Sequence, residues 1–195
     1  LCAFQDSLPM FVVSGQPRLG TMACESGLKL RSRGIQECNI CEMVKPITKY
    51  CVLIKDETRI KYCLQKAFFL MKYGRPGPCW IDIPLDIQGR YINPDELPCF
   101  NPHEEGFSNS FDVDDKIVWE IIEKIKESKR PLVFVGNGVR IAGAHKLFLD
   151  FIERVKIPVV DGMSSVDAVN TDNKLYVGRC GVTGTRAGNF AIQNC

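Results

Sequence analysis

The chain has 195 residues, of which 45% are hydrophobic and 25% charged, a balance typical of a packed protein and not of a disordered one. The formal net charge is +2, and no Lys/Arg block could neutralise a row of phosphates, so we expect no nucleic-acid partner. No apolar run approaches the roughly 20 residues of a membrane helix, and the first residues given do not show a signal-peptide pattern, so we expect a cytoplasmic protein without a membrane segment.

The first part of the chain alternates strand and helix patterns. A short apolar, β-branched run at residues 9–15 predicts a strand buried on both faces of a parallel sheet. Apolar residues at helical spacing predict a helix over 35–44, which Pro46 ends. Residues 48–54 predict the next strand, and Asp56 is placed to cap a second helix.

The helix after Asp56 has an apolar face that we expect to pack on the sheet. That face consists of Ile60, Cys63, Leu64, Ala67, Phe68 and Met71. Gly74 ends the helix, and residues 79–83 predict another strand. The succession strand, helix, strand, helix, strand is typical of a parallel α/β sheet.

A linker follows. Between residues 84 and 111 the composition shifts to Asn, Pro, Gly, Ser and acids, and Pro94, Pro98 and Pro102 prevent a helix or sheet from running through. We therefore predict one domain at residues 1–93, a Pro-rich linker at 94–111 and a second domain at 112–195.

The second domain repeats the pattern. Asp112 or Asp114 begins a helix with an apolar face made of Ile117, Val118, Ile121, Ile122 and Ile125. A strand at 132–135, a helix at 143–155, a strand at 157–160 and a final segment from Tyr176 onward follow. The predicted fold class is α/β, with two partial, Rossmann-like parallel-sheet domains. Each is partial because so few strands leave open edges and too little core.

The ten cysteines sit mostly in apolar patterns, so we interpret them as small core residues and not as a disulfide framework. Cys38 and Cys41 form a Cys-x-x-Cys pair, but no second pair stands at zinc-finger spacing, so no metal ligands are predicted. The chain begins at Leu1 without a Met and stops at Cys195 directly after a helical pattern, and we expect further sequence on both sides.

Gly136, Asn137 and Gly138 stand where a buried strand passes into a helix, a place where backbone amides can bind a phosphate. The dinucleotide fingerprint requires a third Gly or Ala at the position of Ile141. Asp161 ends the next strand, where an acid often binds a ribose. Two interpretations stay open, a nucleotide site and a tight turn without a ligand.

Several strings, in order and at their spacing, resemble the acetolactate synthase-like family of thiamine-diphosphate enzymes. The first group is similar to the second half of that family's pyrimidine-binding domain: DSLP at 6–9, SGQ at 14–16, GIQE at 34–37, ITKY at 47–50, GRPGP at 74–78 and WIDIP at 80–84. The second group is similar to the opening of its central domain: RP at 130–131, VGNG at 135–138, IPVV at 157–160, GRCG at 178–181 and GTRAGN at 184–189.

The resemblance implies thiamine diphosphate and Mg2+ held between two subunits of a homodimer or homotetramer. It also implies an enzyme that decarboxylates a 2-oxo acid and transfers the resulting acyl or aldehyde unit, with the cofactor carrying the hard step. The family's activating Glu is expected upstream of Leu1, and its Mg2+-binding Gly-Asp-Gly motif with its Asn downstream of Cys195. We therefore expect the 195 residues alone to be inactive.

Within this chain, the resemblance gives Gln36 a place at the reacting end of thiamine; the alternative is a residue at a helix N-terminus that bonds to a loop. Glu37 is interpreted as structural, near that helix N-terminus. Lys49 corresponds to a basic position at the active-site entrance. Arg75 corresponds to one at the flavin cleft, or it braces the turn at 74–78.

Members of the family with FAD seat it partly through the turn that matches Gly136–Gly138 and the loop that matches 178–184. Here residues 180–184 lack the Met-His dipeptide of acetolactate synthases, and Asn137 replaces a Gly. FAD therefore remains possible, and the donor and acceptor substrates stay open. The rival hypotheses are a nucleotide-binding module for FAD, NAD or ADP without thiamine chemistry, and a non-catalytic interaction domain.

Overall fold

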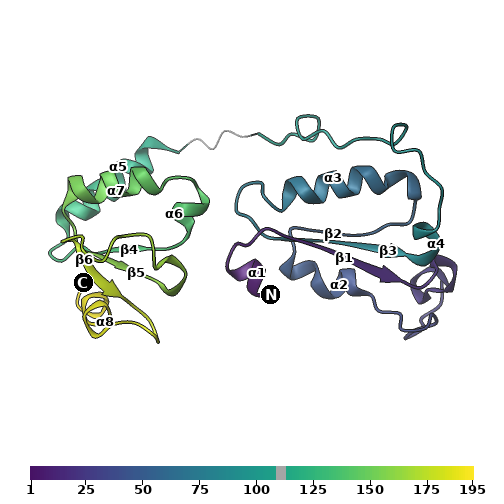
Figure 1. Ribbon diagram of the computed structural model, residues 1–195, viewed down its shortest axis with the longest axis horizontal. Helices are drawn as coiled ribbons and strands as arrows, with labels where there is room; N and C mark the ends of the chain where they lie inside the picture. Colours follow the sequence, from purple (N-terminus) through teal and green to yellow (C-terminus); the bar gives the residue numbers. More distant parts are fainter. Residues whose placement is uncertain (109–112) are drawn as a thin grey trace. The chain divides into compact units, whose positions relative to one another are not determined.

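A computed structural model describes residues 1–108 and 113–195. The chain forms two compact units, Leu1–Asn109 and Ser110–Cys195, and each contains a three-stranded parallel sheet with helices on both faces (Figure 1). This confirms the predicted α/β class. Within the described part of the chain no helix is long and apolar enough to cross a membrane.

The sheet of the first unit has the order β1-β3-β2. Its strands are β1 (Met10–Gln16), β2 (Tyr50–Leu53) and β3 (Pro78–Pro84). Its α-helices are α1 (Cys2–Gln5), α2 (Ile40–Val44), α3 (Ile60–Leu70) and α4 (Leu85–Gln88). Short 3-10 helices lie at Leu19–Thr21, Ala23–Glu25, Lys45–Ile47 and Glu57–Arg59. Helix α3 covers one face of the sheet, and α2 covers the other (Figure 1).

Strand β3 is central because it pairs with both of its neighbours. Cys79 and Ile81 in it are fully buried, and they pack against Cys63, Ala67 and other apolar residues of α3. The prediction that the first strand is buried on both faces is wrong. Among the described strands β1 is an edge, and Val13 is 53% exposed.

The helix predicted over 35–44 begins later, at Ile40. Gln36 has a φ of 59°, in the left-handed region that a right-handed helix cannot include. Residues 34–37 instead form a turn, closed by a hydrogen bond of 3.3 Å from the Glu37 N–H to the Gly34 carbonyl. Glu37 therefore lies before the helix and not at its N-terminus, which corrects the expected position of both residues.

Asp56 caps the next helical segment as predicted, because its side chain accepts a hydrogen bond of 2.9 Å from the Thr58 N–H. The apolar face of α3 is only partly as expected. Phe68 is 56% exposed and lies against the ammonium of Lys72, whereas Leu70 is buried. Gly74 follows the helix end with a φ of 60°.

Residues 94–108 contain no helix or strand in the described structure. They nevertheless lie against α3, because the ring of Phe69 is 5.4 Å from the rings of both Phe100 and Phe107, centroid to centroid. Aromatic packing therefore holds this Pro-containing segment to the first unit. The predicted domain and linker limits stay a prediction, and residues 109–112, with the alternative helix start Asp112, lie outside the described residues.

The second unit has the sheet order β4-β5-β6. Its strands are β4 (Val133–Val135), β5 (Val159–Asp161) and β6 (Tyr176–Arg179). Its α-helices are α5 (Asp115–Glu127), α6 (Gly138–Ile141), α7 (His145–Val155) and α8 (Arg186–Gln193), with a 3-10 helix at Met163–Ser165. Helices α5 and α7 lie on one face of this sheet and α8 lies on the other (Figure 1).

The core of the second unit forms where α7 meets the sheet: Ile152, Val159 and Val160 are fully buried. Asp114 caps α5 through the Lys116 N–H at 2.9 Å, as one of the two predicted starts requires. Helix α5 has no buried residue, and Ile117 on its apolar face is 53% exposed. The amphipathic pattern thus predicted the helix correctly, while its apolar face is only partly covered in this unit.

All ten cysteines are free, and the interpretation of them as core residues holds only in part. Cys63, Cys79 and Cys180 are buried. Cys2, Cys24, Cys38, Cys99 and Cys195 are exposed. The apolar neighbours in the sequence were a poor guide because several of these residues lie at helix ends or in loops.

Candidate functional site

The turn at residues 34–37 lies beyond the carboxyl end of β1. Gly34 packs on Pro17, the residue after the strand, so closely that a Cβ on Gly34 would stand 2.9 Å from the Pro17 side chain. The amide of Gln16, the buried last residue of β1, donates a hydrogen bond of 2.5 Å to the carbonyl of Cys38. Gln36 is thereby held at this edge of the sheet with its side chain exposed.

The carboxyl edge of a parallel sheet is where α/β proteins generally bind ligands. An amide such as that of Gln36 both donates and accepts hydrogen bonds, so it can contact the carbonyl or carboxylate of a small substrate. The predicted role of Gln36 stays a prediction, but its position suits that role.

Lys49 and Arg75 lie at the other end of the strands, where β2 and β3 begin. Lys49 immediately precedes β2 and Arg75 stands just before β3, at the amino ends of strands parallel to β1. The ammonium of Lys49 donates to the carbonyl of Arg75 at 2.8 Å and to the carbonyl of Tyr73, and burial lowers the pKa of Lys49. The Nε of Arg75 donates to the Ser7 hydroxyl at 2.7 Å. The structure thus brings Lys49 and Arg75 together, apart from Gln36.

Three polar side chains inside the first sheet form a series of hydrogen bonds that was not predicted. The Trp80 indole N–H donates to the Ser14 hydroxyl at 2.7 Å, and that hydroxyl donates to the Asp82 carboxylate at 2.6 Å. Asp82 is only 2% exposed. These groups satisfy one another between β1 and β3, so we interpret them as structural. In the sequence, the polar residues inside two apolar strands were the available signal.

In the second unit, Gly136, Asn137 and Gly138 follow β4 at the carboxyl edge of the sheet. A Cβ on either glycine would meet no atom within 4 Å, so the space beside the turn is open. The turn lies next to the loop after β5, because the Gly162 N–H donates to the Val135 carbonyl at 3.3 Å. Two strand ends therefore converge beside an open surface.

Asp161, the last residue of β5, is fully buried. One carboxylate oxygen accepts a hydrogen bond of 3.1 Å from the Tyr176 hydroxyl and lies 3.7 Å from Nε of Arg179. The other oxygen, Oδ2, has no hydrogen-bond partner in the described structure. Burial and the negative charge of Asp161 raise the pKa of Tyr176. The sequence pointed to Asp161, whereas Tyr176 and Arg179 as its partners became evident only from the fold.

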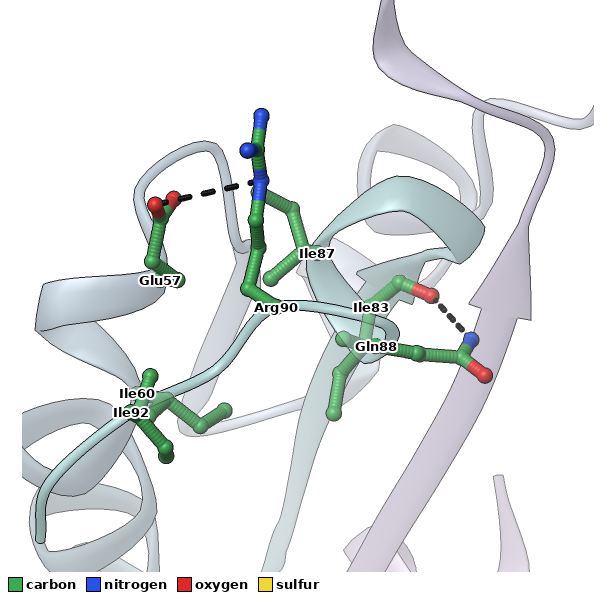
Figure 2. Close-up of a pocket in the computed structure, with 7 residues that line it drawn as sticks. All are labelled: Glu57, Ile60, Ile83, Ile87, Gln88, Arg90 and Ile92. Atoms are coloured by element: carbon green, nitrogen blue, oxygen red, sulfur yellow. Dashed lines mark hydrogen bonds and ion pairs between the residues drawn. The ribbon is translucent and has the colours of Figure 1, made fainter.

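A separate apolar recess of about 250 Å³ lies at the carboxyl end of β3 (Figure 2). It is lined by Glu57, Ile60, Ile83, Ile87, Gln88, Arg90 and Ile92. Glu57 and Arg90 form an ion pair at 3.9 Å, and the Gln88 amide donates to the Ile83 carbonyl at 2.7 Å (Figure 2). None of the predicted site residues lines this recess.

For metal binding, the described residues contain no group of three or more His, Cys, Asp or Glu side chains that could hold an ion. Near the carboxyl end of the first sheet, the Asp86 carboxylate accepts a hydrogen bond of 3.1 Å from the Leu19 N–H.

Residues 118–195 match the family described as thiamine pyrophosphate enzyme, central domain. This range covers most of the second unit and includes the Gly136 turn and Asp161. The second half of the chain is therefore similar to the central domain of thiamine pyrophosphate enzymes.

Along nearly its whole length the chain is similar to acetolactate synthase large subunits, which confirms the resemblance predicted from the motifs. It is 29% identical to the acetolactate synthase large subunit of Lactococcus lactis, over 97% of this chain and 31% of that protein. It is 28% identical to the acetolactate synthase isozyme 3 large subunit of Escherichia coli, over 98% and 32%. It is 31% identical to the acetolactate synthase large subunit of Parasynechococcus marenigrum, over 99% of this chain and 30% of that protein. The chain thus spans about a third of the length of these relatives.

Proposed function

We propose that the protein carrying this chain is a thiamine-diphosphate-dependent enzyme that decarboxylates a 2-oxo acid and transfers the resulting acyl or aldehyde unit. The single observation that carries the proposal is the similarity of 97% of the chain to acetolactate synthase large subunits. The match of residues 118–195 to a thiamine pyrophosphate enzyme domain supports the cofactor.

When bound, thiamine diphosphate supplies a carbanion and an electron sink for the loss of CO2 from the 2-oxo acid. In this chain Gln36 fits a place at its reacting end, because the side chain is exposed at a carboxyl sheet edge and its turn is pinned to β1. Gln36 would bind the carbonyl or carboxylate oxygens of the substrate and orient them. In this proposal Mg2+ and the diphosphate would be held by residues outside the 195.

A homodimer or homotetramer is part of the proposal. Apolar side chains on the β1 edge and on α2 are exposed in this unit, with Val13 53% and Met43 68% exposed. Such surface suits an interface between copies in the full-length protein. Light scattering of that protein would measure the oligomer, and a monomeric active enzyme would contradict this part. The cytoplasmic location stays part of the same proposal.

The test is a cofactor-dependent assay on the full-length protein. CO2 release and carboligation products would be measured with a panel of 2-oxo acids, with and without thiamine diphosphate and Mg2+. We expect activity only with both, and a loss of about a hundredfold in Gln36→Ala, as is usual for misplacing a reacting substrate. Gln193→Ala, an exposed glutamine at the end of α8, serves as the matched control and should keep wild-type rates.

Failure to bind thiamine diphosphate, with no CO2 release from any acid of the panel, would refute the proposal. The 195 residues alone should release no CO2, and measurable turnover by them would contradict the assignment of the activating groups to other parts of the protein.

A second candidate, a nucleotide site on the second unit, is favoured by one specific observation. The open glycine turn lies beside a sheet edge at which a buried carboxylate oxygen of Asp161 lacks a partner. The open turn fits the phosphates of an adenosine diphosphate group, whereas the fully buried Asp161 could reach a ribose hydroxyl only if the residues around it moved. Calorimetric titration with FAD, ADP and NAD would decide. FAD binding suits the enzyme, whereas tight NAD binding without thiamine chemistry would favour a nucleotide-binding module.

A further inference from the structure

The loop between β1 and α2 is folded around one carboxylate, that of Glu37. Oε1 accepts a hydrogen bond of 2.7 Å from the Ala23 N–H. Oε2 accepts two more, each of 2.9 Å, from the N–H groups of Arg33 and Gly34. Three backbone donors, one of them at the start of the 3-10 helix Ala23–Glu25 and two in the loop after it, thus converge on a single side chain.

We propose that Glu37 is a positioning residue for Gln36: its carboxylate clasps residues 23–34 and fixes the turn that presents the Gln36 amide. The catalytic part of this inference rests on the proposed function.

Both the backbone and the side chain of Glu37 hold the same turn. Its N–H donates to the Gly34 carbonyl at 3.3 Å, and its Oε2 accepts from the Gly34 N–H. Gly34 in turn packs directly on Pro17 at the end of β1. The clasp therefore connects the position of Gln36 to the sheet through a short chain of contacts.

The conformation of Gln36 requires such support. Its φ of 59° is one that residues with a Cβ rarely adopt, and it occupies the third position of the turn. A strained backbone of this kind persists only where surrounding contacts fix it. Without the clasp, the loop would relax and the Gln36 amide would lose a defined position.

A carboxylate is the side chain that this geometry needs. An ionised carboxylate only accepts hydrogen bonds, whereas the amide of Gln offers one accepting oxygen and an NH2 that donates. In Glu37→Gln, one side of the clasp would set the NH2 group against a backbone N–H. The backbone hydrogen bonds, those from Arg33 first, also hold the pKa of Glu37 below its ordinary value, so the group is ionised at neutral pH.

The test compares Glu37→Gln with Glu25→Gln in the full-length protein. Glu25 is a matched control on the same loop, where its carboxylate pairs with the exposed Lys55 at 2.5 Å and accepts a contact of 3.9 Å from the Cys24 thiol. Amide hydrogen exchange would be measured by mass spectrometry on peptides covering residues 23–37. We expect exchange there to rise about tenfold or more in Glu37→Gln, with no change in Glu25→Gln and none in peptides of β3.

Kinetics separate positioning from general stability. We expect kcat to fall at least tenfold in Glu37→Gln while KM for the 2-oxo acid changes little, because misplacement acts on the reacting geometry. The double variant Gln36→Ala/Glu37→Gln should be no slower than Gln36→Ala alone, since the clasp acts through Gln36. If Glu37→Gln loses protection throughout the protein, Glu37→Asp, which keeps the charge with a shorter reach, replaces it.

Unchanged exchange at residues 23–37 would overturn the clasp. A double variant slower than Gln36→Ala by the full factor of the single Glu37 change would overturn action through Gln36. Wild-type protein without thiamine-dependent activity would refute the proposed function and the catalytic part of this inference, while the exchange comparison would still decide on the clasp.

Discussion

Gly188→Ala should destabilise the second unit, although it replaces glycine by the best helix former. Gly188 lies in α8, and a Cβ there would stand 2.2 Å from the carbonyl oxygen of Arg179 and 2.6 Å from its carbonyl carbon. These are backbone atoms of β6, so no flexible side chain can move aside. In an open helix the same change would gain about 0.8–1.0 kcal/mol.

Overpacking of this kind costs about 1–3 kcal/mol, and contact with backbone atoms places this site toward the upper end. After the helix-propensity gain, a net loss of about 1–2 kcal/mol remains. For a domain of this size a loss of 1 kcal/mol lowers Tm by about 4–8 °C. Differential scanning calorimetry of the full-length protein would show this as an earlier transition of the central domain.

The control is Gly138→Ala, a helical glycine of the same unit with no atom within 4 Å of the added Cβ. It should leave Tm unchanged or raise it slightly. A Gly188→Ala protein with a Tm at or above that of the Gly138→Ala protein would show that the close approach of α8 to β6 does not exist in solution.

Three further changes have expected outcomes. Asp161→Asn should lower the free energy of unfolding in urea by about 1–3 kcal/mol, because it removes the buried charge partner of Arg179. Asp167→Asn on the surface should lower it by less than about 0.5 kcal/mol. Ile81→Ala should cost about 2–5 kcal/mol, unlike Leu85→Ala, because Ile81 is fully buried and Leu85 is 55% exposed. Glu105 accepts from Lys66 at 2.5 Å, which lowers the pKa of Glu105. The ion pair of Glu105 with Lys66 should therefore hold residues 94–108 against α3 fully above pH 4.5. It should weaken as the pH falls through the lowered pKa of Glu105 in the folded protein, and proteolysis of that segment should then become faster.

The succession of elements was predictable because local signals were strong. Caps at Asp56 and Asp114 and glycine at position 74 mark element ends by local chemistry alone. Which strand is central was not predictable, since β1 and β3 have similar apolar runs and only tertiary pairing decides between them. The late start of α2 was also beyond local rules, because Gln is not a residue that typically adopts a positive φ.

The sequence named candidate residues and not their arrangement. The family motifs pointed to Gln36 and the strand pattern pointed to Asp161, and the roles of both stay predictions. The hydrogen bonds that fix their surroundings come from distant residues. Tyr176 lies 15 residues from Asp161, and Ala23 lies 14 residues from Glu37. Pair contacts of that separation leave no period or spacing in a single sequence, so only the folded chain reveals them.

The opposite placement of Gln36 and the pair Lys49 and Arg75 limits what they can do together. Strand β3 has seven residues, so the two edges of the sheet are separated by roughly 20 Å. One 2-oxo acid cannot touch both edges. In the proposed function, Gln36 would serve the reacting centre. Lys49 and Arg75, which already hold Tyr73 and Ser7, would serve either a second ligand or the packing of the amino edge.

Lys49→Met separates these two possibilities. It removes the donor to two carbonyls, so a purely structural Lys49 predicts a loss of about 1–3 kcal/mol in stability at unchanged KM. A role at the entrance predicts a raised KM even where stability is restored by a compensating change elsewhere.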